Sequence, residues 1–169
     1  MDVLIVSDTH GQTDPLIKLR KQHPGLDYYI HCGDSELDKD HPAVEGYHVV
    51  RGNCDYGDDF PDEKIIEAGD KRIFVTHGHL YNVKYNLMKL KYKAEELNAA
   101  IVCFGHSHIL GFEKLGGILF INPGSLVFPR SRKEKTYIIL TIKDHHYVVN
   151  VYQYGTGLLF SEKIEENFS

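Results

Sequence analysis

The stretch AAIVCFGHSH, residues 99–108, places two histidines one residue apart directly after a short apolar run. A short, continuous apolar run of this kind is typical of a buried strand. Where the chain leaves the sheet the alternation of faces is relaxed, so both imidazoles can reach one point in space. The stretch therefore predicts a strand of an α/β sheet that ends in a pair of candidate metal ligands.

Four other apolar runs end in the same types of residue. They lead into Ser7-Asp8-Thr9-His10, Cys32-Gly33-Asp34, Gly52-Asn53-Cys54-Asp55 and Thr76-His77-Gly78-His79. Open α/β sheets bind their ligands in the loops at the carboxyl ends of parallel strands. The sequence therefore predicts one metal site that collects these loops.

The first third of the chain has a βαβ pattern. Asp14-Pro15 is typical of a helix N-cap followed by proline at the first helical position, and Pro24-Gly25 ends that helix near His23. Strands are predicted before and after it, at Val3–Val6, Asp27–His31 and Tyr47–Val50. Such strands run parallel and place their following loops at one edge.

A hairpin and a second helix are predicted next. Lys64–Glu67 and Arg72–Val75 flank a glycine turn, and apolar residues from Val83 to Leu97 recur at helical spacing, with Lys84 on the solvent side. Beyond residue 108, Gly116-Gly117 separates two strand-like runs. The last strands are expected at Ile118–Ile121, Thr136–Ile142, Tyr147–Tyr152 and Leu158–Ile164.

Composition narrows the class of protein. The 169 residues fit a single domain spanning 1–169, and the net charge of −5 argues against a general nucleic-acid-binding surface. Three cysteines without regular spacing predict neither a disulfide framework nor a Cys-x-x-Cys zinc site. No apolar run approaches the roughly 20 residues that cross a bilayer. A cytoplasmic protein without membrane contact is therefore expected.

The candidate ligands combine imidazole nitrogen with carboxylate and amide oxygen. This mixture suits Mn, Fe, Zn, Ni or Co, whereas an all-oxygen set would suggest Mg or Ca. Seven candidates exceed one tetrahedral site and suit two adjacent ions that share a carboxylate. They are Asp8, His10, Asp34, Asn53, His77, His106 and His108.

In this order and spacing, these residues resemble the motif set of the calcineurin-like metallophosphoesterases. The short length, Gly52-Asn53-Cys54-Asp55 and the later Asn122-Pro123-Gly124-Ser125 resemble the small bacterial and archaeal phosphodiesterases of that superfamily. The resemblance covers nearly the whole chain. It implies a four-layer α/β/β/α sandwich of two mixed β-sheets flanked by helices, with the metals at the strand ends.

The resemblance also implies a role for each ligand. Asp8, His10 and His108 would bind one ion, and Asn53, His77 and His106 the other, with Asp34 bridging the two. The implied reaction is hydrolysis of a small phosphate ester by a metal-bound hydroxide, without a phosphoenzyme. Manganese is the expected metal, with Ni, Fe, Zn or Co as alternatives.

One position departs from the family pattern. Many larger members have a histidine directly after the asparagine, where this chain has Cys54, so assistance to the leaving group must come from elsewhere. The candidate catalytic or positioning residues are Asp34, Asn53, His79 and Asp55. His31 is expected to be packed rather than a ligand, and Cys32 is expected in the core.

Several alternatives stay open. The protein is either a phosphodiesterase, a phosphomonoesterase or short-oligonucleotide phosphoesterase, or a non-catalytic scaffold like the retromer subunit that shares this fold. Residues 122–125 form either an ordinary turn or a support for the metals, and the basic run 130–133 either a solvated loop or a contact to substrate phosphate. The resemblance also allows a homodimer.

Overall fold

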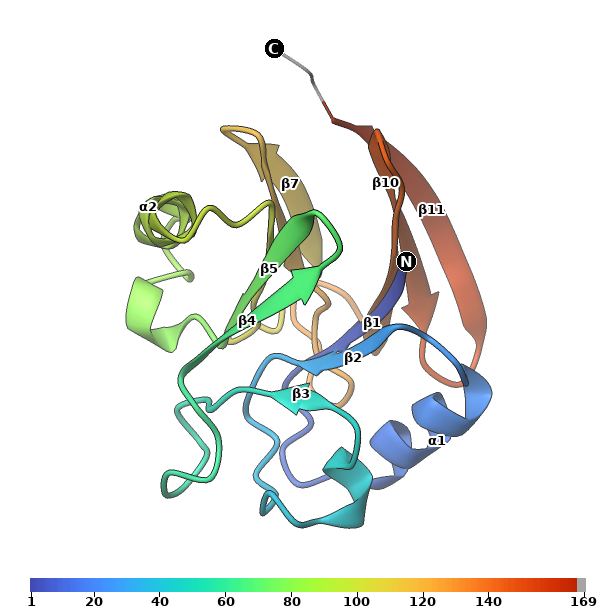
Figure 1. Cartoon of the computed structure of the whole chain (residues 1–169). Helices are drawn as coiled ribbons and strands as arrows, with labels where there is room; N and C mark the ends of the chain where they lie inside the picture. Colours follow the sequence, from blue (N-terminus) through green and yellow to red (C-terminus); the bar gives the residue numbers. More distant parts are fainter. Residues whose placement is uncertain (167–169) are drawn as a thin grey trace.

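The computed structural model describes residues 1–166, and its strands form two mixed sheets (Figure 1). The larger sheet contains, in spatial order, β11 (Gly157–Glu165), β10 (His146–Gln153), β9 (Thr136–Ile142), β1 (Asp2–Val6), β2 (Tyr28–His31) and β3 (His48–Val49). The smaller contains β4 (Glu63–Ala68), β5 (Lys71–Thr76), β6 (Ile101–Cys103), β8 (Ile118–Asn122) and β7 (Gly111–Leu115). The two mixed sheets agree with the predicted fold class.

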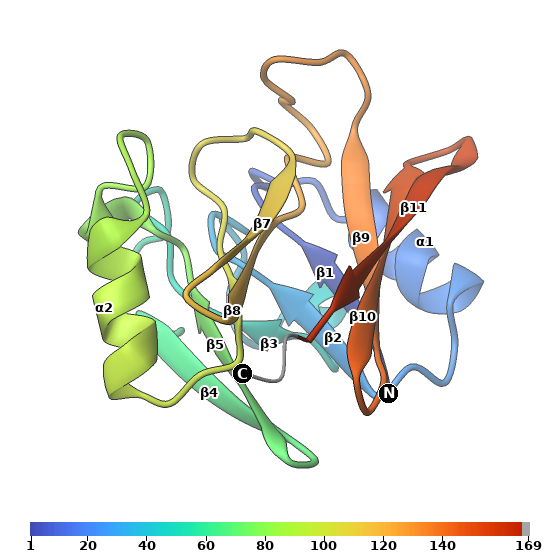
Figure 2. The ribbon, with the colours of Figure 1, turned by 90° about the horizontal axis from the view of Figure 1, so that it is seen from above.

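Helices cover the outer face of each sheet, which gives four layers. Figure 2 shows helix α1 (Asp14–Gln22) and helix α2 (Met88–Glu96) on opposite sides of the two sheets. Short 3₁₀ helices lie at Pro42–Val44 (η1) and His79–Tyr81 (η2). The predicted α/β/β/α sandwich is thereby confirmed.

Alternation along single strands explains why three apolar layers form. In β1, Val3 and Ile5 belong to the cluster between the sheets, whereas Leu4 and Val6 pack against α1. The strand is therefore apolar on both faces, as a strand covered on both sides requires. A third cluster joins α2 to the outer face of the smaller sheet.

Parallel pairing brings the loops that carry the candidate ligands to one edge of each sheet. β1 pairs in parallel with β2 and β2 with β3, while β5 pairs in parallel with β6 and β6 with β8. The carboxyl ends of these strands therefore point to the same end of each sheet. The other strand pairs within the two sheets are antiparallel.

The second helix is shorter than predicted, and this part of the prediction is wrong. The chain takes a left-handed turn at Asn82 and becomes helical only at Met88, whose amide donates to Asn86 Oδ1. Asparagine favours turns and helix starts because its side chain replaces a backbone partner. Val83 and Lys84 consequently lie in a loop. The first helix also begins one residue early, with Thr13 rather than Asp14 as its N-cap.

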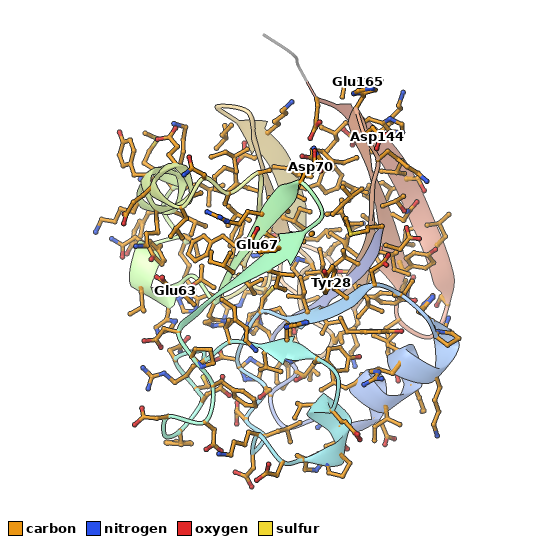
Figure 3. All side chains as sticks on the ribbon, viewed as in Figure 1. Tyr28, Glu63, Glu67, Asp70, Asp144 and Glu165 are labelled. Carbon is orange, nitrogen blue, oxygen red and sulfur yellow. The ribbon has the colours of Figure 1, made fainter. Side chains whose placement is uncertain are left out.

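Charged side chains of both signs lie at the end opposite the strand ends described above, where Lys71 pairs with Asp70 and Lys163 with Glu165. Figure 3 shows Asp70, Asp144 and Glu165 at one end of the molecule, near the turns that precede β5 and β10. These turns lie at the amino ends of β5 and β1. Separately, within residues 1–166 no helix has the length and apolar character needed to cross a membrane.

Candidate metal centre

All seven candidate ligands follow strand ends and come from both sheets. The larger sheet contributes the loops after β1, β2 and β3, and the smaller sheet those after β5 and β6. These loops carry, in chain order, Asp8 and His10, Asp34, Asn53, His77, and His106 and His108. The edge where the two sheets meet is therefore the candidate site.

Strained backbone marks the candidates. The φ angles of Asp8 (56°), Asp34 (55°) and His106 (69°) lie in the left-handed region, as do those of His10 (43°) and His108 (59°). Residues other than glycine adopt this region at a cost of about 1–3 kcal/mol each, and such strain clusters at functional sites. Here it turns the side chains away from the strand direction and toward one another.

Glycines let the loops approach each other. A Cβ at Gly52 would lie 2.0 Å from Asp34 Oδ1, and one at Gly105 would lie 2.0 Å from Ser7 Oγ and 2.6 Å from Asp8 Oδ2. Gly33 combines a φ of +100° with a would-be Cβ 2.7 Å from His77 Nδ1. No side chain larger than hydrogen fits at these three positions unless the site shifts.

Three imidazoles are held by one nitrogen and present the other. The Nδ1 atom lies 2.7 Å from Cys32 O in His77, 2.7 Å from Phe128 O in His108 and 2.7 Å from Glu36 Oε1 in His10. Because each of these partners accepts, Nδ1 donates a proton to it, and Nε2 is the nitrogen that faces the carboxylates. This arrangement is typical of metal-binding histidines.

Each carboxylate is likewise anchored by one oxygen and open at the other. Asp34 Oδ1 accepts from the Cys54 amide at 2.8 Å, and Asp8 Oδ2 accepts from Ser7 Oγ at 2.6 Å. Asp8 Oδ1 is buried without any hydrogen-bond partner. A buried carboxylate oxygen without a partner is costly, so this atom is set up to bind a cation.

The second oxygens of the two carboxylates and the Nε2 atoms of the three histidines lie close together. Asp8 Oδ1 lies 3.2 Å from His108 Nε2, 3.9 Å from His10 Nε2 and 3.8 Å from His77 Nε2. Asp34 Oδ2 lies 3.3 Å from His77 Nε2 and 4.0 Å from His10 Nε2. Asp8–His10–His108 and Asp8–Asp34–His77 each fit within 4.8 Å. These two groups of nitrogen and oxygen donors fit divalent cations.

The pKa shifts show how the charges are distributed. Burial is the largest influence on Asp8 and Asp34 and would raise the pKa of both, but the neighbouring histidines and the other hydrogen bonds to these carboxylates together lower both values. The Asp8 carboxylate in turn raises the pKa of His108, and the carboxylates of Asp34 and Asp8 raise that of His77 against burial. Both carboxylates therefore stay ionised, which favours a bound cation.

The remaining candidates lie around this core. Asn53 Oδ1 is 3.1 Å from His77 Nε2, and the His106 ring is edge-on to His77 at 5.1 Å between centroids. Within residues 1–166, His106 belongs to none of the compact donor groups. His79 is half-buried, 5.5 Å from His77 between ring centroids, and its Nδ1 has no partner.

Asp55 acts through the loops rather than at the open centre. Its carboxylate accepts from the amides of Asp34 (2.9 Å), Gly52 (2.7 Å) and Glu36 (2.7 Å). With both oxygens engaged, Asp55 ties the loop after β2 to the loop after β3. It is a positioning residue.

Sequence reasoning missed Glu36, which holds His10, because a lone glutamate in a polar segment carries no pattern. The motif at residues 122–125 does support the site. Asn122 Nδ2 donates to Gly105 O at 3.1 Å, and Ser125 Oγ donates to Asp8 O at 2.8 Å. His31 is buried, as expected, with Nε2 2.9 Å from Thr9 Oγ1.

A four-layer sandwich with clustered imidazoles and carboxylates at its strand ends is the architecture of a metal-dependent phosphoesterase. The family model for the calcineurin-like phosphoesterase superfamily domain matches residues 1–145. The chain belongs to this superfamily.

Individual relatives agree with this assignment. The chain is 51% identical to the probable metallophosphoesterase YsnB of Bacillus subtilis over 90% of each protein, and 28% identical to the phosphodiesterase YfcE of Escherichia coli over 83% of this chain and 87% of that protein. A predicted phosphoesterase from Streptococcus pneumoniae has a crystal structure that superposes with a TM-score of 0.92, at 34% identity and 97% coverage of each chain. Zinc-complexed Vps29 of Entamoeba histolytica shares the fold, at a TM-score of 0.79, 21% identity and coverage of 99% of this chain and 100% of that one.

Proposed function

We propose that this protein is a phosphodiesterase that uses two divalent cations to hydrolyse a small phosphate ester. The observation that carries the proposal is the convergence of ionised carboxylates and imidazole Nε2 atoms around the buried Asp8 Oδ1. Two groups of donors share this atom, which suits two neighbouring ions.

The ligand assignment is the one that the family resemblance implies, and its first set of three is also one of the compact donor groups. Asp8, His10 and His108 would hold one cation, whereas Asn53, His77 and His106 would hold the other. Asp34 Oδ2 lies within 4.0 Å of a nitrogen from each group and is the proposed bridge. When bound, such cations supply an activated water as nucleophile and offset the charge of the phosphoryl oxygens. Manganese is the metal we propose to test first.

The chain's own residues then orient and protect the reacting groups. Glu36, Cys32 O and Phe128 O keep the protons on Nδ1 of three histidines. Asp55 holds the two loops that carry Asp34 and Asn53. His79, whose ring lies beside His77 and His106, is the proposed contact to substrate.

We rank a diester above a monoester because of the similarity to the phosphodiesterase YfcE, and we expect a good leaving group because of Cys54. The pKa of its thiol is raised to about 11, by burial and by the charge of Asp34. A thiol of this pKa is a weak acid, so it gives little help to a poor leaving group. A substrate with a good leaving group avoids that need.

The scaffold alternative rests on the shared fold with Vps29 alone. The presence of all seven candidate ligand residues in this chain argues against a scaffold. We also propose a cytoplasmic location, supported by three cysteines that are all unpaired. The homodimer stays an expectation that light scattering in solution can test.

The decisive experiment compares bis-p-nitrophenyl phosphate with p-nitrophenyl phosphate, using metal-stripped protein reconstituted with Mn²⁺. We expect diester turnover that requires metal, binds two ions per chain and falls at least 100-fold in Asp34→Asn. Asp70→Asn, the same change at the exposed opposite end, is the control and should match wild type. Metal-loaded protein that turns over neither ester would contradict the proposal.

A further inference from the structure

A pocket lies beside the candidate metal centre on the outer face of the smaller sheet. Its volume is about 560 Å³, within the range of small-molecule sites. Helix α2 starts only at Met88, so the end of this face nearest the site is left to the loop that carries Val83 and Leu87. The missing helical turn is what opens the pocket.

The walls are aromatic and aliphatic. Phe104 directly follows β6, Phe120 lies in β8, and Ile109 closes the side next to the His106–His108 loop. Ile109 is 43% exposed. Phe112 of the edge strand β7 also borders the pocket, but its ring packs toward Phe160 of β11 and the cluster between the sheets. Flat apolar surfaces in a concave site favour a ring system over a sugar or a second charged group.

Two cations stand where the pocket meets the metal centre. Lys84 and Arg130 both line the pocket, and the Arg130 amide donates to His108 O at 3.0 Å. Both residues are exposed and lie in loops beside the pocket. In this arrangement an anion at the metals and an apolar group in the pocket can belong to one molecule.

The single carboxylate of the pocket lies at the far side. Glu113 is two residues beyond Gly111 along β7, roughly 7 Å farther from the site. Gly111 pairs with Asn122 at the site end of the strands, and Glu113 pairs with Phe120. Positive charge therefore lies near the phosphate position and negative charge away from it.

We propose that this pocket binds an aromatic ester group of the substrate, with Lys84 and Arg130 contacting its phosphate oxygens. The substrate class is thus a phosphate ester with at least one aromatic or heteroaromatic arm. This proposal rests on the proposed function for the position of the phosphate. Lys84 is exposed, as expected, but lies in the loop before α2 rather than on a helix. The proposal favours a phosphate contact for Arg130 over a solvated loop.

The test is a binding measurement on Zn²⁺-loaded protein, with phosphonates whose C–P bond is not hydrolysed. Naphthylmethylphosphonate and methylphosphonate share one head group and differ only in the arm. By calorimetry, the naphthyl compound should bind at least tenfold more tightly. Amide shifts in NMR spectra should include Leu87, Ile109 and Phe112.

Three variants make the test specific. Gly111→Trp fills the pocket, because a Cβ at Gly111 meets nothing within 4 Å and its φ is not positive. It should abolish the naphthyl advantage, that is, the tighter binding of the naphthyl compound relative to methylphosphonate. Thr156→Trp adds the same ring at an exposed turn between β10 and β11 and should keep it. Ile109→Ser, at a partly exposed wall position, should reduce the advantage severalfold without the added bulk.

The outcomes separate the two proposals. Equal affinity for both phosphonates, or a naphthyl advantage that survives Gly111→Trp, would overturn the pocket assignment. Tight naphthyl binding in a protein that hydrolyses no phosphate ester would leave the pocket in place and contradict the proposed activity instead. Arg130→Gln should weaken both phosphonates by a similar factor, and weakening of neither would remove its role.

Discussion

At the scale of single residues, Cys54 decides which leaving groups the site can serve. Its amide anchors Asp34, and Asn53 Nδ2 lies 3.5 Å from its Sγ, so the side chain borders the ligands. With its pKa raised to about 11 by burial, the thiol does not ionise near pH 7 and transfers a proton poorly.

Cys54→His should therefore widen the range of substrates. An imidazole here adds an acid with a pKa nearer neutrality, so turnover of a dialkyl diester, which has a poor leaving group, should rise roughly 10- to 100-fold. Turnover of bis-p-nitrophenyl phosphate should change less than about threefold, since p-nitrophenolate needs no proton. Steady-state kinetics on both substrates check this, and an equal change for both would argue against the acid role.

His31 is a second residue whose environment sets a measurable property. The Gly33 amide donates to Nδ1 at 3.1 Å, so Nε2 carries the proton and donates to Thr9 Oγ1. Burial lowers its pKa to about 4, with the charges of nearby groups as smaller influences. The folded protein thus keeps this ring neutral where the unfolded chain, with a pKa near 6.5, binds a proton.

The free energy of unfolding should therefore decrease as the pH is lowered from 6.5 to 4. Above pH 6.5 His31 is neutral in both the folded and the unfolded state. As the pH falls from 6.5 toward 4, the unfolded chain binds a proton that the folded state does not, and the free energy of unfolding decreases by about 3 kcal/mol in total. His31→Gln keeps a donor and an acceptor but does not titrate. Urea unfolding of chelator-treated protein at pH 7.5 and pH 5 should show a smaller loss in the variant. An unchanged loss would mean that His31 is not buried as a neutral ring.

At the scale of elements, the loops after the strands tolerate no added volume. Gly105→Ala would push a methyl group into Ser7 Oγ and Asp8 Oδ2, and we expect a loss of roughly 1–3 kcal/mol together with weaker metal binding. Gly111→Ala is the matched control, because its Cβ meets open space and should be neutral or stabilising by about 0.4–1 kcal/mol. Denaturant unfolding and metal calorimetry on both variants measure the difference.

At the scale of the whole molecule, the candidate centre joins the two sheets. Asp8 and Asp34 come from the larger sheet, whereas His77 comes from the smaller one. A bound cation would therefore resist separation of the sheets as well as disorder of single loops. The apolar cluster between the sheets, which includes Ile5 and Ile101, opposes the same motion.

Metal should accordingly stabilise the entire fold. A cation at 100 times its Kd adds about 2.7 kcal/mol, which corresponds to a rise in Tm of roughly 5–10 °C for a chain of this size. Scanning calorimetry should show one transition that moves with metal concentration in wild type and in Asp70→Asn. Most of the rise should vanish in Asp34→Asn. Two separate transitions, only one of them sensitive to metal, would show that the centre does not couple the sheets.

The sequence by itself determined where most strands lie along the chain and which residue types follow them, because local apolar periodicity and glycine-bounded motifs are readable along the chain. It did not determine how the second helix begins, because that depends on the turn at Asn82 and the contact from Asn86. It also could not reveal Glu36 as the partner of His10, the unpaired oxygen of Asp8, or the pocket near Arg130. Those features arise between segments distant in sequence, and only the packing of the two sheets brings them together.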